Sequence, residues 1–274
     1  MTRAVLVTSL NPAADATQDA AVASWLGHGF SVISHNVAAE AARLAPRYPA
    51  VAFRAPERTA TAKRLPLIGG LIAEACAEAP DLCAIVNADI VLRPGTEIVR
   101  RLRPPLGNAL VAVARTDVDD LASLANPALA RGFDAFFFGP GLAAILDERP
   151  FCIGMPNWDY WLPLAAWAAG WALSSITAPV ALHPRHETRW SDKTLSFNHH
   201  LMRYLFSQRF PDESFLPASA AEYEDLAFRA LRDATLPPEE RAAAIEALAA
   251  LEDKTMSAML RTLRAAMPEF QPGA

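Results

Sequence analysis

The sequence predicts an α/β fold in which a mostly parallel, Rossmann-like central sheet is flanked by helices and followed by a C-terminal helical appendage. Up to about residue 217, short apolar runs alternate with segments of helical spacing. Polar residues follow several of these runs directly, as they do at the strand ends of a parallel sheet. Beyond that point the composition shifts to Ala, Glu, Leu and Arg in a helical pattern.

The first strand is expected at residues 4–8, where a β-rich apolar run stops at the turn formed by Asn11 and Pro12. A helix follows at 17–26, and Gly27 ends it. The other strands expected in this region are at 30–34, 83–87, 109–114, 134–138 and 173–182. The other helices expected there are at 66–79, 98–102, 157–171 and 196–206. Because strands and helices alternate at the start, the first three strands are expected to be parallel.

Residues 162–182 contain no charged side chain and are about as long as a membrane span. Pro163, Gly170 and Pro179 interrupt this stretch, and its composition changes midway from Ala and Trp to β-branched residues. We therefore expect a buried helix followed by a buried strand and no transmembrane segment. The apolar run at the N-terminus is too short for a signal peptide, which favours a cytoplasmic location.

The 274 residues, of which 52% are hydrophobic, suffice for one large domain and a small appendage. The expected bounds are 1–217 for the sheet domain and 218–274 for the helical appendage. Within the appendage, helical patterning is visible at 221–233 and 238–266, and Pro237 and Pro238 separate the two stretches.

The charge balance argues against a nucleic-acid partner. The chain has 25 Lys and Arg against 30 Asp and Glu, a net charge of -5, and no block of basic residues. Three cysteines, Cys76, Cys83 and Cys152, lie among apolar residues without a CxxC spacing. They are expected to be reduced core residues and not a disulfide framework or a zinc site.

Ligands of open parallel sheets bind beyond the carboxyl ends of the strands, so the residues after each apolar run are candidates for a site. These residues are Thr8, Ser9, His35, Asn36, Asn87, Asp89 and His183. Asp89 leaves a buried run and therefore needs a partner or an ion, and a divalent cation that bridges phosphates is one such ion. A turn or helix cap is an equally good explanation from spacing alone.

A second candidate region opens the helix expected at 157–171. Trp158 beside Asp159 suits a sugar ring, with the aromatic face for stacking and the carboxylate for a hydroxyl. The alternative is structural: Asn157 is the N-cap and Asp159 favours the helix dipole, which would keep that acid ionised. Core positions are expected for Trp161, Trp167 and Trp171.

Lys63 and Arg64 belong to a locally basic segment that precedes a helix. Such side chains can neutralise a diphosphate, although a solvated loop carries similar charges.

Several of these segments, in this order, resemble the GT-A nucleotide-diphospho-sugar transferase superfamily, in a small bacterial-type branch. The segments that carry the resemblance are 6–10, 85–90, 133–138, 150–154 and 158–161. The resemblance implies a glycosyltransferase that moves a sugar from a nucleotide-diphosphate donor to a hydroxyl acceptor such as a glycan.

The resemblance also assigns roles to the candidate residues. Asp89 would hold Mn²⁺ or Mg²⁺ on the diphosphate, and His183 lies in a late loop that can complete the metal site. Thr8, Ser9 and Asn36 would bind the base and ribose. Asp159 would be the acceptor-side base and Trp158 would shape the sugar pocket.

In this chain Asn87 stands where the superfamily's DxD motif has its first carboxylate, which weakens the metal site unless other ligands compensate. This residue favours an alternative, a non-catalytic nucleotide-sugar-binding or glycan-binding protein. A nucleotidyltransferase is a further alternative, but residues 9–12 are not the glycine-rich loop that it would usually have.

Overall fold

The computed structural model describes residues 2–13, 15–60, 64–77, 79–102, 106–147, 149–185, 194–216 and 219–270. The chain divides into two compact units. The first unit comprises Met1–Thr188 and Pro268–Ala274, and the second comprises Arg189–Met267.

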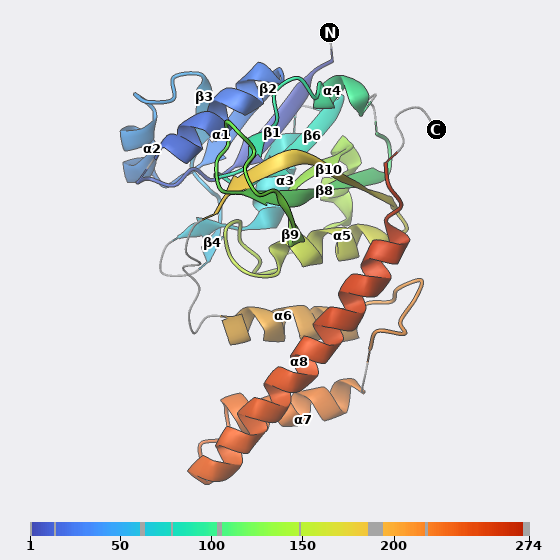
Figure 1. Ribbon diagram of the computed structural model, residues 1–274. Coiled ribbons are helices and arrows are strands. Elements are labelled where there is room, and N and C mark those ends of the chain that lie inside the picture. The colour runs from blue at the N-terminus through green and yellow to red at the C-terminus, as the bar shows by residue number, and fades with distance from the viewer. Residues whose placement is uncertain are drawn as a thin grey trace. The chain divides into compact units, whose positions relative to one another are not determined.

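An eight-stranded sheet with the order β3-β2-β1-β6-β9-β8-β10-β7 forms the centre of the first unit (Figure 1). Its strands are β1 Ala4–Thr8, β2 Phe30–His35, β3 Val51–Arg54, β6 Leu82–Val86, β7 Val91–Leu92, β8 Ala109–Val118, β9 Ala128–Phe138 and β10 Ala172–Pro184. A separate two-stranded sheet joins β4 Thr59–Ala60 to β5 Leu65–Pro66.

Strands β3, β2, β1 and β6 are parallel neighbours, and β10 is parallel to β8. Strand β9 runs antiparallel to both β6 and β8, and the short β7 is antiparallel to β10. The predicted α/β class with a mostly parallel sheet is confirmed. Chain order reverses between β1 and β6, and in open α/β sheets such a switch point is where ligands bind.

Helices cover both faces of the sheet (Figure 1). The helices of the first unit are α1 Ala16–Gly27, α2 Ala38–Leu44, α3 Ile68–Cys76, α4 Ile98–Arg101 and α5 Trp158–Ala168, with the 3-10 helix η1 Pro140–Ile145. Along β6, Ala84 and Val86 face α1, whereas Cys83 on the alternate face contacts α3. Phe136 on β9 contacts Trp158, which places α5 on the α3 face.

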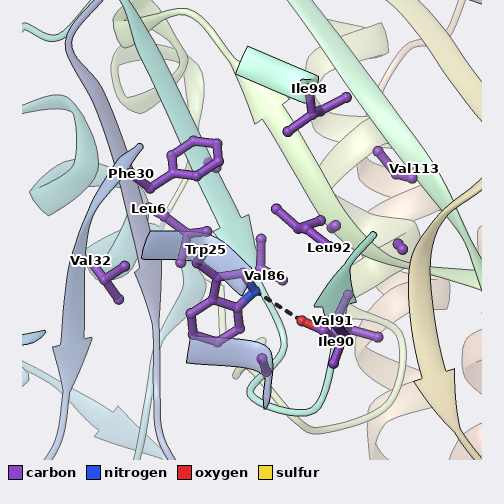
Figure 2. Close-up of a cluster of buried hydrophobic side chains, with 14 of the residues drawn as sticks. Leu6, Trp25, Phe30, Val32, Val86, Ile90, Val91, Leu92, Ile98 and Val113 are labelled. Carbon is purple, nitrogen blue, oxygen red and sulfur yellow. Dashed lines mark hydrogen bonds between the residues drawn. The ribbon is translucent and has the colours of Figure 1, made fainter. Parts of the chain in front are cut away.

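The core on the α1 face is built around Trp25, which is fully buried. Its indole packs among Leu6, Phe30 and Val86, as Figure 2 shows. The indole nitrogen donates a hydrogen bond of 2.9 Å to the carbonyl oxygen of Ile90, so the one polar atom of this side chain is satisfied. This bond fixes the turn that follows β6, immediately beyond Asp89.

The segment 162–182 forms the end of α5 and most of β10, as predicted. Among the residues that the structure describes, no helix is long and apolar enough to cross a membrane. Several expectations need correction. Strand β8 continues four residues beyond the predicted end at 114, and β9 begins six residues before the predicted start at 134. The elements that the sequence did not predict are α2, β3, β4, β5, β7 and η1.

The second unit contains α6 Thr194–Ser207, α7 Ala220–Leu231 and α8 Pro238–Ala266. Helix α7 begins with a capping box in which Ser219 and Glu222 bond to each other's backbone N–H. A buried chain of hydrogen bonds joins the three helices: His199 Nδ1 lies 3.1 Å from the Tyr223 hydroxyl, which donates to Glu252 at 2.8 Å.

This division differs from the predicted bounds of 1–217 and 218–274. Helix α6 belongs with α7 and α8, because His199 stacks on Tyr223 with ring centroids 5.8 Å apart. Residues 268–270 return to the first unit, where Ser175 N–H donates to Pro268 O at 2.9 Å and Phe270 N–H donates to Ser175 O at 2.7 Å.

Candidate functional site

Polar side chains from four neighbouring strands and one helix meet near the carboxyl ends of β6, β8 and β10. We call this group the strand-end cluster. Its members are Asn87, Asp89, Arg115, Asp117, Asp134, Asp159 and His183. Four of the seven had been singled out from the sequence: Asn87, Asp89, Asp159 and His183.

His183, near the end of β10, is held between two carboxylates. Its Nδ1 lies 2.9 Å from Asp117 Oδ1 and its Nε2 lies 3.5 Å from Asp89 Oδ2. Burial of the ring disfavours its charged form, but the hydrogen bond and the charge of Asp89 outweigh it, so the pKa of His183 is raised. The side chain of Asp89 is 42% exposed, so this carboxylate can also reach a ligand in solvent.

The geometry of this pair fits a cation that is shared with a phosphate group. In the neutral tautomer that donates Nδ1–H to Asp117, Nε2 would present a lone pair beside Asp89, and a carboxylate on the other ring nitrogen commonly orients histidine ligands in metal sites. Within the described ranges, no group of three or more His, Cys, Asp and Glu side chains could hold a metal ion alone. Mg²⁺ and similar ions commonly take one or two protein ligands and complete their shell with phosphate oxygens and water.

Arg115 on β8 connects two of the acids. Its Nε lies 2.9 Å from Asp117 Oδ1, and its Nη1 lies 2.9 Å from Asp134 Oδ2. Burial raises the pKa of Asp134, and the charge of Arg115 opposes this rise without cancelling it. The guanidinium therefore holds two carboxylates together that would otherwise repel each other.

Asn87 is bonded to Asp134 through both its backbone and its side chain. Its N–H donates to Asp134 O at 2.9 Å, and its Nδ2 donates to Asp134 Oδ1. A carboxylate at position 87 could not donate this bond when ionised and would add a negative charge beside Asp134. This contact explains why an amide stands at the first position of the DxD-like triplet.

Asp159 lies in the first turn of α5 and faces β9. Its Oδ2 accepts a hydrogen bond of 3.2 Å from Phe133 N–H. Burial, with the charge of Asp134 as a second cause, raises the pKa of Asp159 to about 7. This shift of the pKa is opposite to the one expected from the helix dipole, because burial of the carboxylate outweighs the favourable helix terminus.

Gly132 leaves the space that the Asp159 carboxylate occupies. A Cβ atom at position 132 would lie 2.7 Å from Asp159 Oδ2. A larger residue there would therefore push the carboxylate away from Phe133.

The predicted nucleotide-binding residues lie at the ends of β1 and β2, and their polar atoms are bonded to protein groups. Thr8 Oγ1 donates to Val86 O at 2.7 Å, and Ser9 Oγ donates to His35 O at 2.9 Å. Asn36 Nδ2 donates to Leu10 O at 2.9 Å. Thr8 and Asn36 are buried, whereas Ser9 is partly exposed. The bond from Thr8 ties the end of β1 to the strand that leads to Asn87.

Trp158 is buried and packs edge-on against Phe136, with ring centroids 5.5 Å apart. Trp161 stacks on Phe151 at 5.1 Å, and Trp171 is also buried, in agreement with the core positions predicted for them. Trp167 is partly exposed.

Arg64 is exposed and adopts a left-handed backbone with φ 51°. Lys63 lies outside the described residues.

Arg115 and Asp117 are site residues that the sequence did not predict, and no site role for Asp134 was visible in its pattern. A signal for the first two was present, because they follow the apolar run at 109–114 as directly as Asn87 follows its own run. Ending the predicted strand at 114 left them in a loop.

No protein-family model and no curated protein matches the chain. Among solved structures, a mannosyltransferase from Pyrobaculum calidifontis in complex with GDP-Man and Mn²⁺ is matched at 14% identity with a TM-score of 0.48. The match covers 97% of this chain and 85% of that chain.

TarS from S. aureus is matched at 11% identity with a TM-score of 0.46, over 97% of this chain and 90% of that chain. A mannose-1-phosphate geranyltransferase from Thermus thermophilus is matched at 12% identity with a TM-score of 0.36, over 67% of this chain and 74% of that chain. All three matches have TM-scores below 0.5 and identities below 15%. The function of this chain has to be inferred from its own side chains.

Proposed function

We propose that this chain is an enzyme that transfers a sugar from a nucleotide-diphosphate sugar to a hydroxyl acceptor, assisted by a divalent metal. The observation that carries the proposal is the approach of Asp89 Oδ2 to His183 Nε2, at 3.5 Å, beyond the strand ends. Arg115 and Asp134 connect this pair to Asp159. The proposed metal-phosphate site and the proposed base would therefore belong to one electrostatically linked cluster.

Asp89 and His183 would bind Mn²⁺ or Mg²⁺, with oxygens of the donor diphosphate and water as the remaining ligands. When bound, the metal neutralises the charge that develops on the departing nucleoside diphosphate. Asp117 would keep His183 in place through its contact with Nδ1. Lys63 and Arg64 are proposed to add positive charge near the phosphates.

The nucleoside end of the donor is proposed to lie against the ends of β1 and β2. Ser9, which is partly exposed, is the residue there with a hydroxyl that a ligand could reach. Thr8 and Asn36 would act mainly by holding the loop after β1 in shape. Trp158 would shape the sugar pocket from within the core, through its contact with Phe136.

Asp159 is proposed as the base that accepts the proton of the acceptor hydroxyl. A pKa of about 7 means that the carboxylate is both substantially ionised and basic near neutral pH. Asp159 is partly exposed as a residue although its carboxylate is enclosed, and the acceptor hydroxyl is proposed to approach that carboxylate on the side away from Gly132.

Asn87 is the residue that would favour a non-catalytic nucleotide-sugar-binding protein instead. Its bond to Asp134 provides a different reason for an amide at this position. A binding module would also have no need for an acid with a pKa of about 7 in the cluster.

Isothermal titration with UDP-, GDP- and CDP-sugars, each with and without Mn²⁺, tests donor binding. Release of the nucleoside diphosphate then tests turnover. We expect one nucleotide class to bind more tightly with Mn²⁺ and to be turned over. Asp147→Asn, which changes an exposed acid outside the strand-end cluster, is the matched control for Asp89→Asn. Binding without release would favour the non-catalytic alternative, and absence of binding by every donor would overturn the proposal.

A further inference from the structure

Two of the three cysteines lie against each other in the structure, although they are seven positions apart in the sequence and do not form a CxxC motif. Cys76 is the last residue of α3 and Cys83 is the second residue of β6. Their sulfur atoms are 3.7 Å apart. The third cysteine, Cys152, is also buried, and its Sγ lies 3.7 Å from Pro150 O.

The two thiols of the pair have different environments. Cys76 is partly exposed, whereas Cys83 is completely buried. The hydrogen bond with the Cys83 thiol lowers the pKa of Cys76, burial opposes this effect, and the N–H of Ala143 in η1 adds to it. The pKa of Cys83 is raised by its bond to Cys76 and by burial. The accessible thiol is thus also the one that more readily becomes a thiolate, which is the reactive form.

We propose that Cys76 and Cys83 are a peroxide-sensitive pair that forms a reversible disulfide between α3 and β6. In the first step the Cys76 thiolate attacks one oxygen of hydrogen peroxide, the O–O bond breaks, and the released hydroxide takes up a proton to leave as water. Cys76 becomes a sulfenic acid. In the second step the Cys83 sulfur attacks the Cys76 sulfur, and the Cys83 proton leaves with the sulfenic hydroxyl as a second water.

The electron balance closes with hydrogen peroxide as the only oxidant. The two thiols give up two electrons in forming the S–S bond, and the peroxide accepts them in forming water. Cys83 is buried, so only Cys76 can meet the oxidant directly, and Cys83 is placed to resolve the sulfenic acid. Forming a bond of about 2.05 Å requires the two sulfurs to approach from contact distance, by side-chain rotation and a small shift of the α3 end.

The test uses the full chain, reduced and then treated with hydrogen peroxide, with iodoacetamide to label the remaining thiols. Before labelling, we expect the intact mass to fall by two hydrogen atoms. After labelling, a non-reducing digest should contain a cross-linked peptide with Cys76 and Cys83. Cys152 should stay available for labelling after unfolding. Dithiothreitol should restore all three thiols.

Three variants make the result specific. Cys76→Ser and Cys83→Ala should each abolish the cross-link, and Cys152→Ser should leave it unchanged, with circular dichroism showing that each variant folds. In Cys83→Ala, Cys76 should accumulate as a sulfenic acid that dimedone traps. Oxidation of Cys76 to a sulfinic acid without a cross-link in the unmodified chain would overturn the proposal. So would a cross-link that includes Cys152.

Discussion

Four acids of the strand-end cluster, Asp89, Asp117, Asp134 and Asp159, share one guanidinium and one imidazole. Such an excess of negative charge at one place attracts a divalent cation, and it also raises the pKa of the acids that are most enclosed. The same group of residues thereby combines an exposed carboxylate, which we propose as the metal ligand, with an enclosed carboxylate whose pKa is raised to about 7.

Asp89→Asn should abolish metal-dependent turnover while leaving the melting temperature almost unchanged. The carboxylate is well exposed, so the fold does not depend on it, whereas a neutral amide is a much poorer ligand for Mn²⁺ or Mg²⁺. Nucleoside diphosphate release and thermal unfolding measure the two effects. A large loss of stability with normal turnover would show that Asp89 is only a cap.

Turnover should rise with pH through about 7, because Asp159 must be ionised to act as a base. Asp159→Asn should lower turnover strongly and leave donor affinity nearly intact, since the phosphates would be bound elsewhere. Rate against pH and donor titration check both parts. Normal turnover in this variant would leave Asp159 with a structural role only.

The raised pKa of Asp159 should also make the free energy of unfolding depend on pH. Between the ordinary pKa of 3.8 and about 7, the folded state binds a proton at Asp159 that the unfolded state has lost, so stability falls as pH rises through this window. Asp159→Asn should remove that fall. Urea unfolding at the two ends of the window gives the free energy of unfolding of the variant and of the unmodified chain. If this free energy changed equally with pH in both proteins, the assignment would be contradicted.

Asn87→Asp would restore the first carboxylate of a DxD motif, but we expect it to destabilise the chain by about 1–3 kcal/mol. The new carboxylate would lie against the buried acid of Asp134 and lose the bond that Asn87 donates. The double change Asn87→Asp with Asp134→Asn exchanges the two groups and should recover part of the loss. Urea unfolding of the three proteins measures this, and an unchanged stability in the single variant would refute it.

At the level of elements, Trp25 is the largest side chain by which helix α1 packs against the sheet, together with Ala21 and Val22 (Figure 2). Trp25→Ala should cost about 3–5 kcal/mol because it empties a large buried volume. Trp25→Phe keeps most of the apolar contact but leaves the Ile90 carbonyl without its donor, at a cost of about 1 kcal/mol. Urea unfolding measures both, with Trp167→Ala as the partly exposed control. Equal losses in Trp25→Ala and Trp167→Ala would contradict this account.

Hydrophobic periodicity predicted the strands and helices that depend on a local sequence pattern. It did not predict features that depend on a partner far away in the sequence. Strands β1, β2 and β6 lie within one residue of their predicted ends, because an apolar run bounded by turn residues is a local signal. Nothing local to β9 reveals that it runs antiparallel between β6 and β8, or that Asp134 meets Asn87. The sequence therefore indicated where polar residues emerge but not which of them meet.

At the scale of the whole molecule, residues 268–270 lie beside β10, where Glu269 forms an isolated parallel bridge with Ser175. Glu269 accepts hydrogen bonds from the N–H and the hydroxyl of Thr177, and Phe270 packs against the α1-face core. A chain shortened to end at Met267 should melt at a lower temperature and associate at high concentration, because it exposes unpaired strand groups. Light scattering and thermal unfolding measure this. Glu269→Gln, which keeps the backbone pairing, should stay monodisperse.

The second unit is inserted between two segments that both belong to the first unit, since the chain leaves at Thr188 and rejoins at Pro268. When residues 189–267 unfold alone, they form a loop closed at both ends and not a free tail. A closed loop has fewer conformations, so this segment loses less entropy when it folds again. The hydrogen bonds made by three residues beside β10 thereby favour the refolding of a helical unit to which none of those residues belongs.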